Sequence, residues 1–131
     1  GEELMAENAE KGLQLACEKT GASVKEYTAG PYFNKDENGG GHEWIIEFEN
    51  APEDIEYFTE VLDNSLKSLN SDYEAKRYKD MNMQMPKLVA VKNGTFYEWL
   101  KSKGKLGGQN KVPRLSNHRK LIEEIHGLGL L

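Results

Sequence analysis

Apolar and polar positions alternate along the first half of the chain with two different periods. Apolar side chains recur about every 3.6 residues from residue 4 to residue 17, and Gly21 supplies a glycine stop, which predicts an amphipathic helix. Residues 22–29 contain Val24 and Tyr27 and predict a strand with weak alternation. After a hairpin loop at 36–41, Trp44, Ile46 and Phe48 alternate with Ile45, Glu47 and Glu49, which predicts a second strand with one buried face.

The longest helix is predicted directly after this strand. Asn50 is expected to cap it, with Pro52 in the first turn and Glu53 completing a capping box. A stripe of apolar side chains at helical spacing should pack on the sheet; it consists of Ile55, Phe58, Leu62, Leu66 and Leu69.

Shorter elements are predicted in the second half. Ser71 with Glu74 has the spacing of a capping box and predicts a helix over 72–80, followed by a loop at 81–86 and a strand at 88–91. Thr95 with Glu98 repeats that spacing and predicts a helix that Gly104 ends.

The last predicted helix follows a loop at 107–114 and is expected to be capped by Ser116 or Asn117. The order of elements predicts an α+β fold with a small, mainly antiparallel sheet of about three or four strands covered by helices.

Length and composition agree with one folded domain. The chain has 131 residues, of which 37% are hydrophobic and 30% charged, enough for one core and too few for two ordinary ones. No apolar run is long enough to cross a bilayer and no secretion signal opens the chain, so we expect a cytoplasmic protein without a membrane partner. The single cysteine and the three histidines have no metal-ligand spacing, so no metal site is expected.

Charged residues are unevenly distributed along the chain. The formal net charge is −5, yet residues 101–120 contain seven Lys or Arg and no acidic residue. Such a stretch can bind an anion, or it can be a solvated surface loop, and charge alone leaves both readings open.

The end of this basic stretch combines groups that suit a phosphate ligand. Gly107 and Gly108 allow the backbone to approach a ligand closely, Gln109 offers an amide, and Lys111 and Arg114 offer cations. The glycine-lysine-serine/threonine pattern of a P-loop is absent, so the composition by itself is a weak signal.

Residues 108–114, Gly-Gln-Asn-Lys-Val-Pro-Arg, follow Tyr-Glu-Trp-Leu at 97–100. Together they resemble the Gln-aromatic-Lys-x-Pro-Arg motif near the C-terminus of the auxin-responsive Gretchen Hagen family of acyl-acid amido synthetases, and look closest to its bacterial members. Residues 43–48 and 70–77 are similar to further stretches of that family's C-terminal domains, so the resemblance covers nearly the whole chain. Asn110 departs from the motif, because the family usually has an aromatic residue or His there.

The resemblance implies one part of an adenylate-forming ligase. Residues 1–131 would be the single, mobile C-terminal domain, and the N-terminal adenylation domain that binds ATP and a carboxylic acid would be absent from this chain. The abrupt helical start at the first residues also favours a domain boundary. The parent enzyme would form an acyl-adenylate and then an amide with an amino acid, using ATP and Mg²⁺. The isolated domain would carry no cofactor and would be inactive.

The resemblance also implies roles for individual residues. Lys111 would meet the α-phosphate or acyl-adenylate oxygens when the domain closes over its partner, the N-terminal domain. Arg114 would bind a phosphate or carboxylate. The loop would be shaped by Gly107, Gly108 and Gln109, and the hinge would lie next to Gly1, Glu2 and Glu3. The alternative for Lys111 is an exposed lysine without a function.

Two other classes of function remain open. Residues 104–107, Gly-Lys-Leu-Gly, match the Gly-x-x-Gly loop of nucleic-acid-binding KH domains, although the overall acidity opposes backbone binding and no nucleic acid is expected as a partner. A non-catalytic interaction module is the other alternative, with an adaptable surface made of Tyr73, Tyr78, Met81, Met83 and Met85. Packing is the competing explanation for these methionines, and also for Tyr57, Tyr97 and Trp99.

Overall fold

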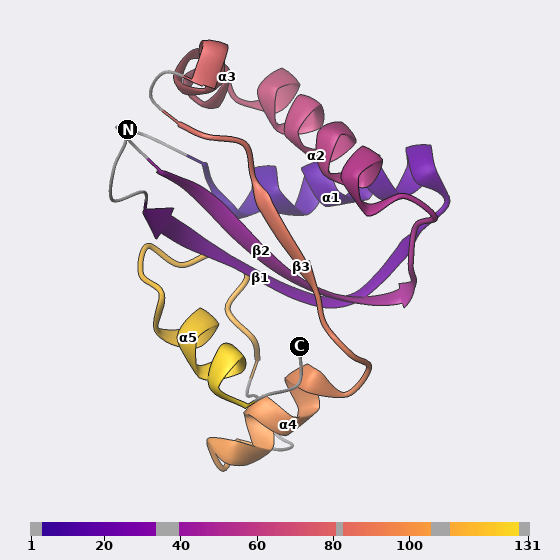
Figure 1. Cartoon of the computed structure of the whole chain (residues 1–131), viewed down its shortest axis with the longest axis vertical. Helices are drawn as coiled ribbons and strands as arrows, with labels where there is room; N and C mark the ends of the chain where they lie inside the picture. The colour runs from indigo at the N-terminus through magenta and orange to yellow at the C-terminus, as the bar shows by residue number, and fades with distance from the viewer. Residues whose placement is uncertain (1–3, 34–39, 81–82, 106–110, 129–131) are drawn as a thin grey trace.

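The computed structural model describes residues 4–33, 40–80, 83–105 and 111–128. Within these ranges a three-stranded sheet lies between two layers of helices (Figure 1), with α1, α2 and α3 on one face and α4 and α5 on the other. The elements in chain order are α1 (Ala6–Thr20), β1 (Ser23–Phe33), β2 (Gly40–Asn50), α2 (Ile55–Leu69), α3 (Ser71–Arg77), the 3-10 turn η1 (Tyr78–Asp80), β3 (Lys87–Ala90), α4 (Thr95–Ser102) and α5 (Lys120–Gly127).

The sheet has the order β1-β2-β3 and mixes both strand directions. β1 and β2 form a long antiparallel pair, whereas β3 pairs parallel to β2 from Glu43 opposite Lys87 to Ile46 opposite Ala90. The parallel pair is possible because α2 and α3 carry the chain back across the sheet before β3 begins. The α+β prediction is therefore confirmed, with one strand of the sheet parallel.

The two predicted amphipathic helices pack against each other and against one face of the sheet. α1 ends at Gly21, which takes the left-handed conformation at φ 81° and donates its N–H to the Cys17 carbonyl at 2.8 Å. Gly12 lets α1 and α2 approach closely, since a Cβ there would lie 2.7 Å from Cδ2 of Leu66. The main core, with Trp44 and Ile46 of β2, fills the space between these helices and the sheet.

The helix caps differ from the predicted ones. α2 begins at Ile55, and the carboxylate of Asp54, rather than Asn50, accepts the N–H of Tyr57 at 3.1 Å. β2 continues through Asn50, whose amide nitrogen instead donates to the Gly21 carbonyl at 3.1 Å. The predicted cap failed because tertiary pairing extends the strand beyond its alternating pattern.

The caps of the other helices also differ from the predicted residues. Ser71 is the first residue of α3, and Asn70 before it accepts the N–H of Tyr73 at 2.9 Å. Thr95 is the first residue of α4, which Gly94 precedes in the left-handed conformation at φ 93°. α5 begins at Lys120, so the helix starts later than a cap at Ser116 or Asn117 would place it.

β2 is buried on both faces, so the prediction of a single buried face is wrong. Trp44 and Ile46 point into the main core, and Ile45 belongs to a second core cluster with residues of α4 and α5. On that second face Glu43 and Glu47 are also buried, at 2% and 1% exposure. Buried carboxylates are tolerated only with partners, and both have them.

Glu47 caps α4 from a distance in the sequence. Its two carboxylate oxygens accept the N–H of Gly94 at 2.8 Å and of Phe96 at 3.1 Å. Lys25, on β1, lies 3.6 Å from the same carboxylate. The first amides of a helix lack internal partners and carry partial positive charge, so a buried carboxylate stabilises them.

Glu43 holds α5 on the sheet. One of its oxygens accepts from Arg119 at 2.9 Å, and the other lies 2.8 Å from Nε2 of His126. Burial alone would raise the pKa of Glu43, but the hydrogen bonds and charges of His126 and Arg119 outweigh it and lower the pKa below its ordinary value. Arg119 also donates to the Pro31 carbonyl at 2.8 Å, which joins α5 to β1.

A third buried carboxylate joins α2 to α3. Asp63 accepts from Tyr73 at 2.6 Å and from two nitrogens of Arg77 at 2.9 and 2.7 Å. Burial would raise the pKa of Asp63, but the hydrogen bonds from Arg77 and Tyr73 lower it. Arg77 also donates to the carbonyl of Met83 and the sulfur of Met85, and both methionines are partly buried. Met83 also packs against the main core, which confirms the packing explanation for this residue, whereas Met81 lies outside the described residues.

The Glu47 cap predicts a loss of stability. Replacing Glu47 with Ala should lower the free energy of unfolding by about 2 kcal/mol, because two amides at the start of α4 lose their acceptor. Glu49→Ala, on the exposed end of the same strand, is the matched control and should cost less than about 0.5 kcal/mol. Urea denaturation measures both values, and equal effects of the two substitutions would contradict the capping role.

The lowered pKa of Glu43 predicts a stability loss in acid. Below the ordinary glutamate pKa of about 4.3, Glu43 is protonated in the unfolded chain but stays ionised in the folded chain. The unfolded state therefore binds more protons, and the free energy of unfolding falls as the pH decreases. The loss continues until the pH lies below the pKa of folded Glu43. Between pH 7 and pH 3, the free energy of unfolding measured by denaturation should decline less steeply for Glu43→Gln than for the unchanged chain. Parallel curves would show that Glu43 does not contribute to the acid sensitivity.

Candidate functional site

The segment that carries the predicted phosphate-binding cations lies along the free edge of β1. Ala29 donates to the Arg114 carbonyl at 3.0 Å, and Ser116 donates back to the Ala29 carbonyl at 2.9 Å, so Leu115 forms a parallel bridge with Ala29. The buried hydroxyl of Thr28 donates to the Pro113 carbonyl at 2.6 Å. We call residues 111–116 the anchored segment, because three hydrogen bonds fix it to β1.

Lys111 stands at the exposed beginning of the anchored segment. Its neighbour Val112 is buried in the second core cluster at 4% exposure, which fixes the backbone one residue away. Within the described part of the chain, the ammonium group of Lys111 has no ion pair and no hydrogen bond. A cation on a fixed backbone with an unengaged head group is able to meet an external anion at little structural cost.

Arg114 is engaged within the domain. Its guanidinium forms an ion pair with Glu26, lies 4.9 Å from the centre of the Tyr27 ring and reaches the Tyr27 carbonyl at 3.5 Å. Tyr27 is buried, and its hydroxyl donates to Glu10 of α1 at 2.8 Å. Arg114 therefore ties the anchored segment to β1, while its side chain remains 43% exposed and able to contact a ligand as well.

A shallow cavity of about 290 Å³ opens beside Arg114. α1 contributes Glu10 and Cys17 to its wall, and residues 22–27 contribute the start of β1. Burial raises the pKa of the Cys17 thiol, so this cysteine stays protonated at neutral pH and is a poor nucleophile. The side chains of this cavity that lie nearest to the anchored segment are thus the charged Glu26 and Arg114.

Several predicted site residues lie outside the described ranges. These are Gly1, Glu2 and Glu3 of the expected hinge, and Gly107, Gly108, Gln109 and Asn110 of the loop. The roles assigned to them stay predictions. Among the residues that are described, no group of three or more His, Cys, Asp or Glu could hold a metal ion, and no helix is long and apolar enough to span a membrane.

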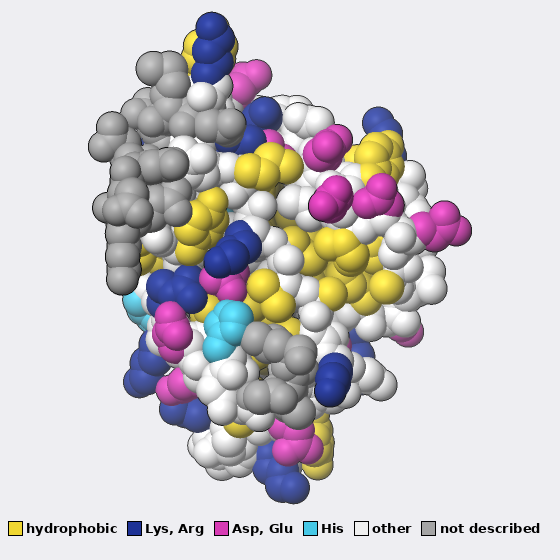
Figure 2. All heavy atoms as spheres, in the orientation of Figure 1, with side chains coloured by type: hydrophobic (Ala, Val, Ile, Leu, Met, Phe, Trp, Pro, Cys, Tyr) yellow, Lys and Arg dark blue, Asp and Glu magenta, His cyan; other side chains and the backbone are white. Residues whose placement is uncertain are grey.

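The basic stretch contains both free and engaged cations. Lys103, Arg114 and Arg119 form ion pairs with acidic residues elsewhere in the fold. Lys101, Lys105, Lys111 and Lys120 are exposed. On the face drawn in Figure 2, acidic side chains gather over α2, on the opposite side of the sheet from α4 and α5. Acidic side chains also lie among the cations over α4 and α5 (Figure 2).

The alternative functions find little support in this arrangement. The chain after Gly104 returns as the anchored segment on β1 before α5 begins, whereas a KH loop joins two helices directly. Tyr73 is buried in the Asp63 network and cannot contribute to an adaptable contact surface, although Tyr78 is exposed. Tyr57 and Tyr97 are also exposed, so their predicted packing role is wrong, whereas Trp99 is buried as predicted.

Thr28 is the site residue that the sequence did not reveal. It sits in a strand with weak alternation, and its partner Pro113 is 85 residues away, so no local pattern connects the two. Arg114 was recognised through the motif, but its contacts with Glu26 and Tyr27 were not. Only the pairing of the anchored segment with β1 brings these residues together.

Comparison with known proteins identifies similar chains. Residues 7–120 match the family model described as the GH3 family C-terminal domain. Two similar solved structures are the AtGH3.15 acyl acid amido synthetase in complex with 2,4-DB, at TM-score 0.69 and 18% identity, and the GH3.15 acyl acid amido synthetase, at TM-score 0.68 and 17% identity. In both cases 92% of this chain is covered, and it spans 23% of the other chain. No curated protein sequence matches the chain.

The hydrogen bond from Thr28 to Pro113 predicts a local loosening of the anchored segment when Thr28 is replaced. Thr28→Val keeps the shape of the side chain but removes the hydrogen bond to Pro113, which should raise cleavage by trypsin after Lys111 about fivefold, the equivalent of about 1 kcal/mol. Thr59→Val is the matched control, because that buried hydroxyl bonds only within α2. Equal cleavage rates in the two variants would contradict the anchoring role of Thr28.

Proposed function

Because the chain belongs to the GH3 family and matches the model of its C-terminal domain, we propose that it is the mobile domain of an ATP-dependent acyl acid amido synthetase. It closes over the N-terminal domain of the same protein and assists carboxylate adenylation and amide formation with an amino acid. A bacterial source, a cytoplasmic location, and ATP with Mg²⁺ in the parent enzyme belong to the same proposal. The domain alone is inactive, because one anchored segment cannot position two substrates.

The share of the relatives that this chain spans supports a division of labour between two domains. The chain corresponds to 23% of each acyl acid amido synthetase that it resembles, so most of such a protein lies outside it. The parent would activate the acid by attack of a carboxylate oxygen on the α-phosphorus of ATP, with release of pyrophosphate. Attack of the amine on the acyl carbon would then form the amide and release AMP.

Lys111 is the residue that we assign to this chemistry. Negative charge develops on the phosphate oxygens during adenylation, and AMP leaves as an anion in the second step. A fixed cation stabilises such charge best where its position is set before the reaction. The observation that carries the proposal is the placement of Lys111, which has a buried neighbour in Val112 and an ammonium without a partner in the described part of the domain.

Arg114 has a second place in the proposal. Its guanidinium already pairs with Glu26, so a phosphate or carboxylate of the substrate would have to share it with that carboxylate. Arg114 would therefore bind ligand more weakly than Lys111 and would chiefly hold the anchored segment in place. The loop residues 107–109 would approach the ligand with their backbone.

A comparison of two lysines in the full-length protein tests the proposal. Lys111→Ala should slow ATP–pyrophosphate exchange or amide formation about 100-fold, the typical effect of removing one group that stabilises charge in a transition state. Lys101→Ala removes an exposed cation of the same basic stretch from α4 and should change both rates less than twofold. Circular dichroism and thermal unfolding verify that both variants fold.

Each outcome decides one part of the proposal. Wild-type rates in Lys111→Ala for both half-reactions would remove Lys111 from the mechanism. A full-length protein that shows no ATP–pyrophosphate exchange with a broad panel of carboxylic acids would refute the ligase function itself. Equal losses in the two lysine variants would indicate a general charge effect in place of a specific contact.

A further inference from the structure

α4 and the anchored segment are both fixed in the second core cluster. On one side, Trp99 of α4 is buried in this cluster, and on the other side Val112 is buried in it. α5 covers the cluster with three apolar residues, namely Leu121, Ile122 and Ile125. The burial of Val112, next to Lys111, therefore depends on how α5 is joined to α4.

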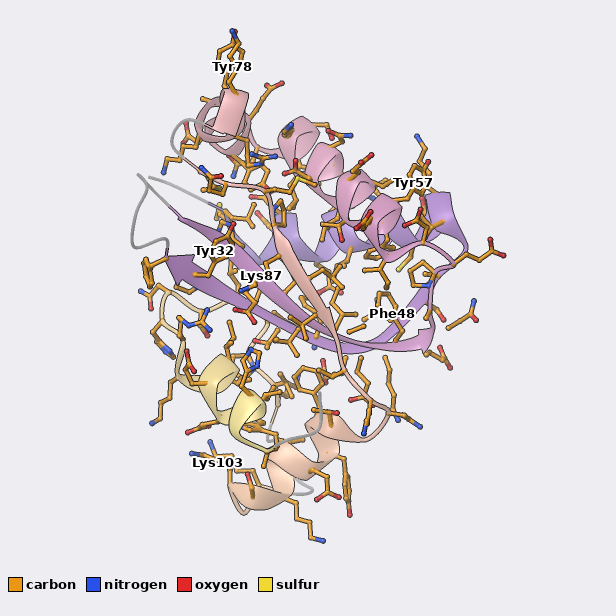
Figure 3. All side chains as sticks on the ribbon, in the orientation of Figure 1. Tyr32, Phe48, Tyr57, Tyr78, Lys87 and Lys103 are labelled. Atoms are coloured by element: carbon orange, nitrogen blue, oxygen red, sulfur yellow. The ribbon has the colours of Figure 1, made fainter. Side chains whose placement is uncertain are left out.

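Glu124 of α5 makes that connection. One carboxylate oxygen accepts the indole N–H of Trp99 at 2.9 Å, and the other accepts from the ammonium of Lys103 at 3.0 Å. Figure 3 places Lys103 where α4 and α5 meet. Glu124 thus contacts both the buried anchor of α4 and the residue directly after its last turn.

The end of α4 is a compact turn that these contacts hold in place. Lys103 donates its N–H to the carbonyl of Trp99 at 3.2 Å, and Lys105 donates to the carbonyl of Leu100 at 2.9 Å. Gly104 between them takes the left-handed conformation at φ 68°. The hydrogen bonds from Trp99 and Lys103 lower the pKa of Glu124, so it is ionised at neutral pH and accepts both bonds.

From this geometry we propose that Glu124 is a positioning residue for Lys111: by joining α5 to Trp99 and Lys103, it holds together the second core cluster in which Val112, the neighbour of Lys111, is buried. The catalytic part of this inference rests on the proposed function of Lys111. Glu124 itself touches no substrate and acts only through the segment that it helps to place. The family model match ends at residue 120, so Glu124 lies beyond the matched residues.

The first test measures how firmly Glu124 holds the end of α4, without any assay of activity. In the full-length protein, Glu124→Ala should raise hydrogen exchange at the amides of Lys103 and Lys105 about fivefold, because the contacts of Glu124 with Trp99 and Lys103 that hold this turn are lost. The amides of β1 paired with β2 should keep their exchange rates. Glu98→Ala, an exposed acidic residue of α4, is the matched control and should leave the amides at the end of the helix unchanged.

The second test is a double-mutant cycle with Lys111. Glu124→Ala alone should slow the Lys111-dependent half-reaction about tenfold, with little change in the KM for ATP, but cause less than twofold further loss in the Lys111→Ala background. A purely structural role would slow both backgrounds equally. Glu124→Gln keeps an acceptor for Trp99 and should restore most of the rate.

The results separate the two proposals. Unchanged exchange at Lys103 and Lys105 in Glu124→Ala would overturn the positioning role whatever the enzyme does. Increased exchange with equal losses of activity in both backgrounds would overturn the connection to Lys111. If Lys111→Ala alone kept wild-type rates, the proposed function of Lys111 would fail, and the exchange experiment would still decide whether Glu124 fixes the end of α4.

Discussion

The two buried glutamates of β2 are the constraint on which the C-terminal half of the domain depends. A carboxylate in a protein interior is stable only when charged or hydrogen-bonded partners surround it. Glu47 accepts hydrogen bonds from the first amides of α4, and Glu43 contacts Arg119 and His126 at the two ends of α5. Both helices are thus directed to the second face of the sheet by polar contacts, and the apolar cluster around Ile45 fills the space between them.

Sequence patterns predicted the elements whose stability is local and missed those decided by tertiary contacts. The stripe of α2 and the glycine stop of α1 were recognised because each depends on residues within a few turns. Glu43 and Glu47 have the alternation of solvent-facing residues, and nothing nearby indicates that residues 47 or 83 positions later will cover them. The parallel direction of β3 and the shifted caps of α2 and α4 have the same origin, since each is set by pairing with a distant strand or side chain.

The candidate site, too, was predicted only in part from the sequence. The motif at 108–114 located Lys111 and Arg114 and, through resemblance, the family that the sequence comparison then showed. It could not distinguish the two cations, because the contacts of Arg114 with Glu26 and Tyr27 arise only when the anchored segment pairs with β1. A motif thus identifies chemical groups, while the fold decides which of them remain available to a ligand.

The long sequence separation of the Thr28–Pro113 contact has a consequence for biosynthesis. The bond joins residues 85 positions apart, and contacts of that range form late in folding, because the intervening chain must be ordered before they gain stability. The residues of α1, the β1–β2 hairpin and α2 are all synthesised before residue 111. The anchored segment, which carries Lys111, can therefore pair with β1 only after β1, β2 and β3 have been synthesised, and a chain that ended before residue 111 would leave this edge of β1 unpaired.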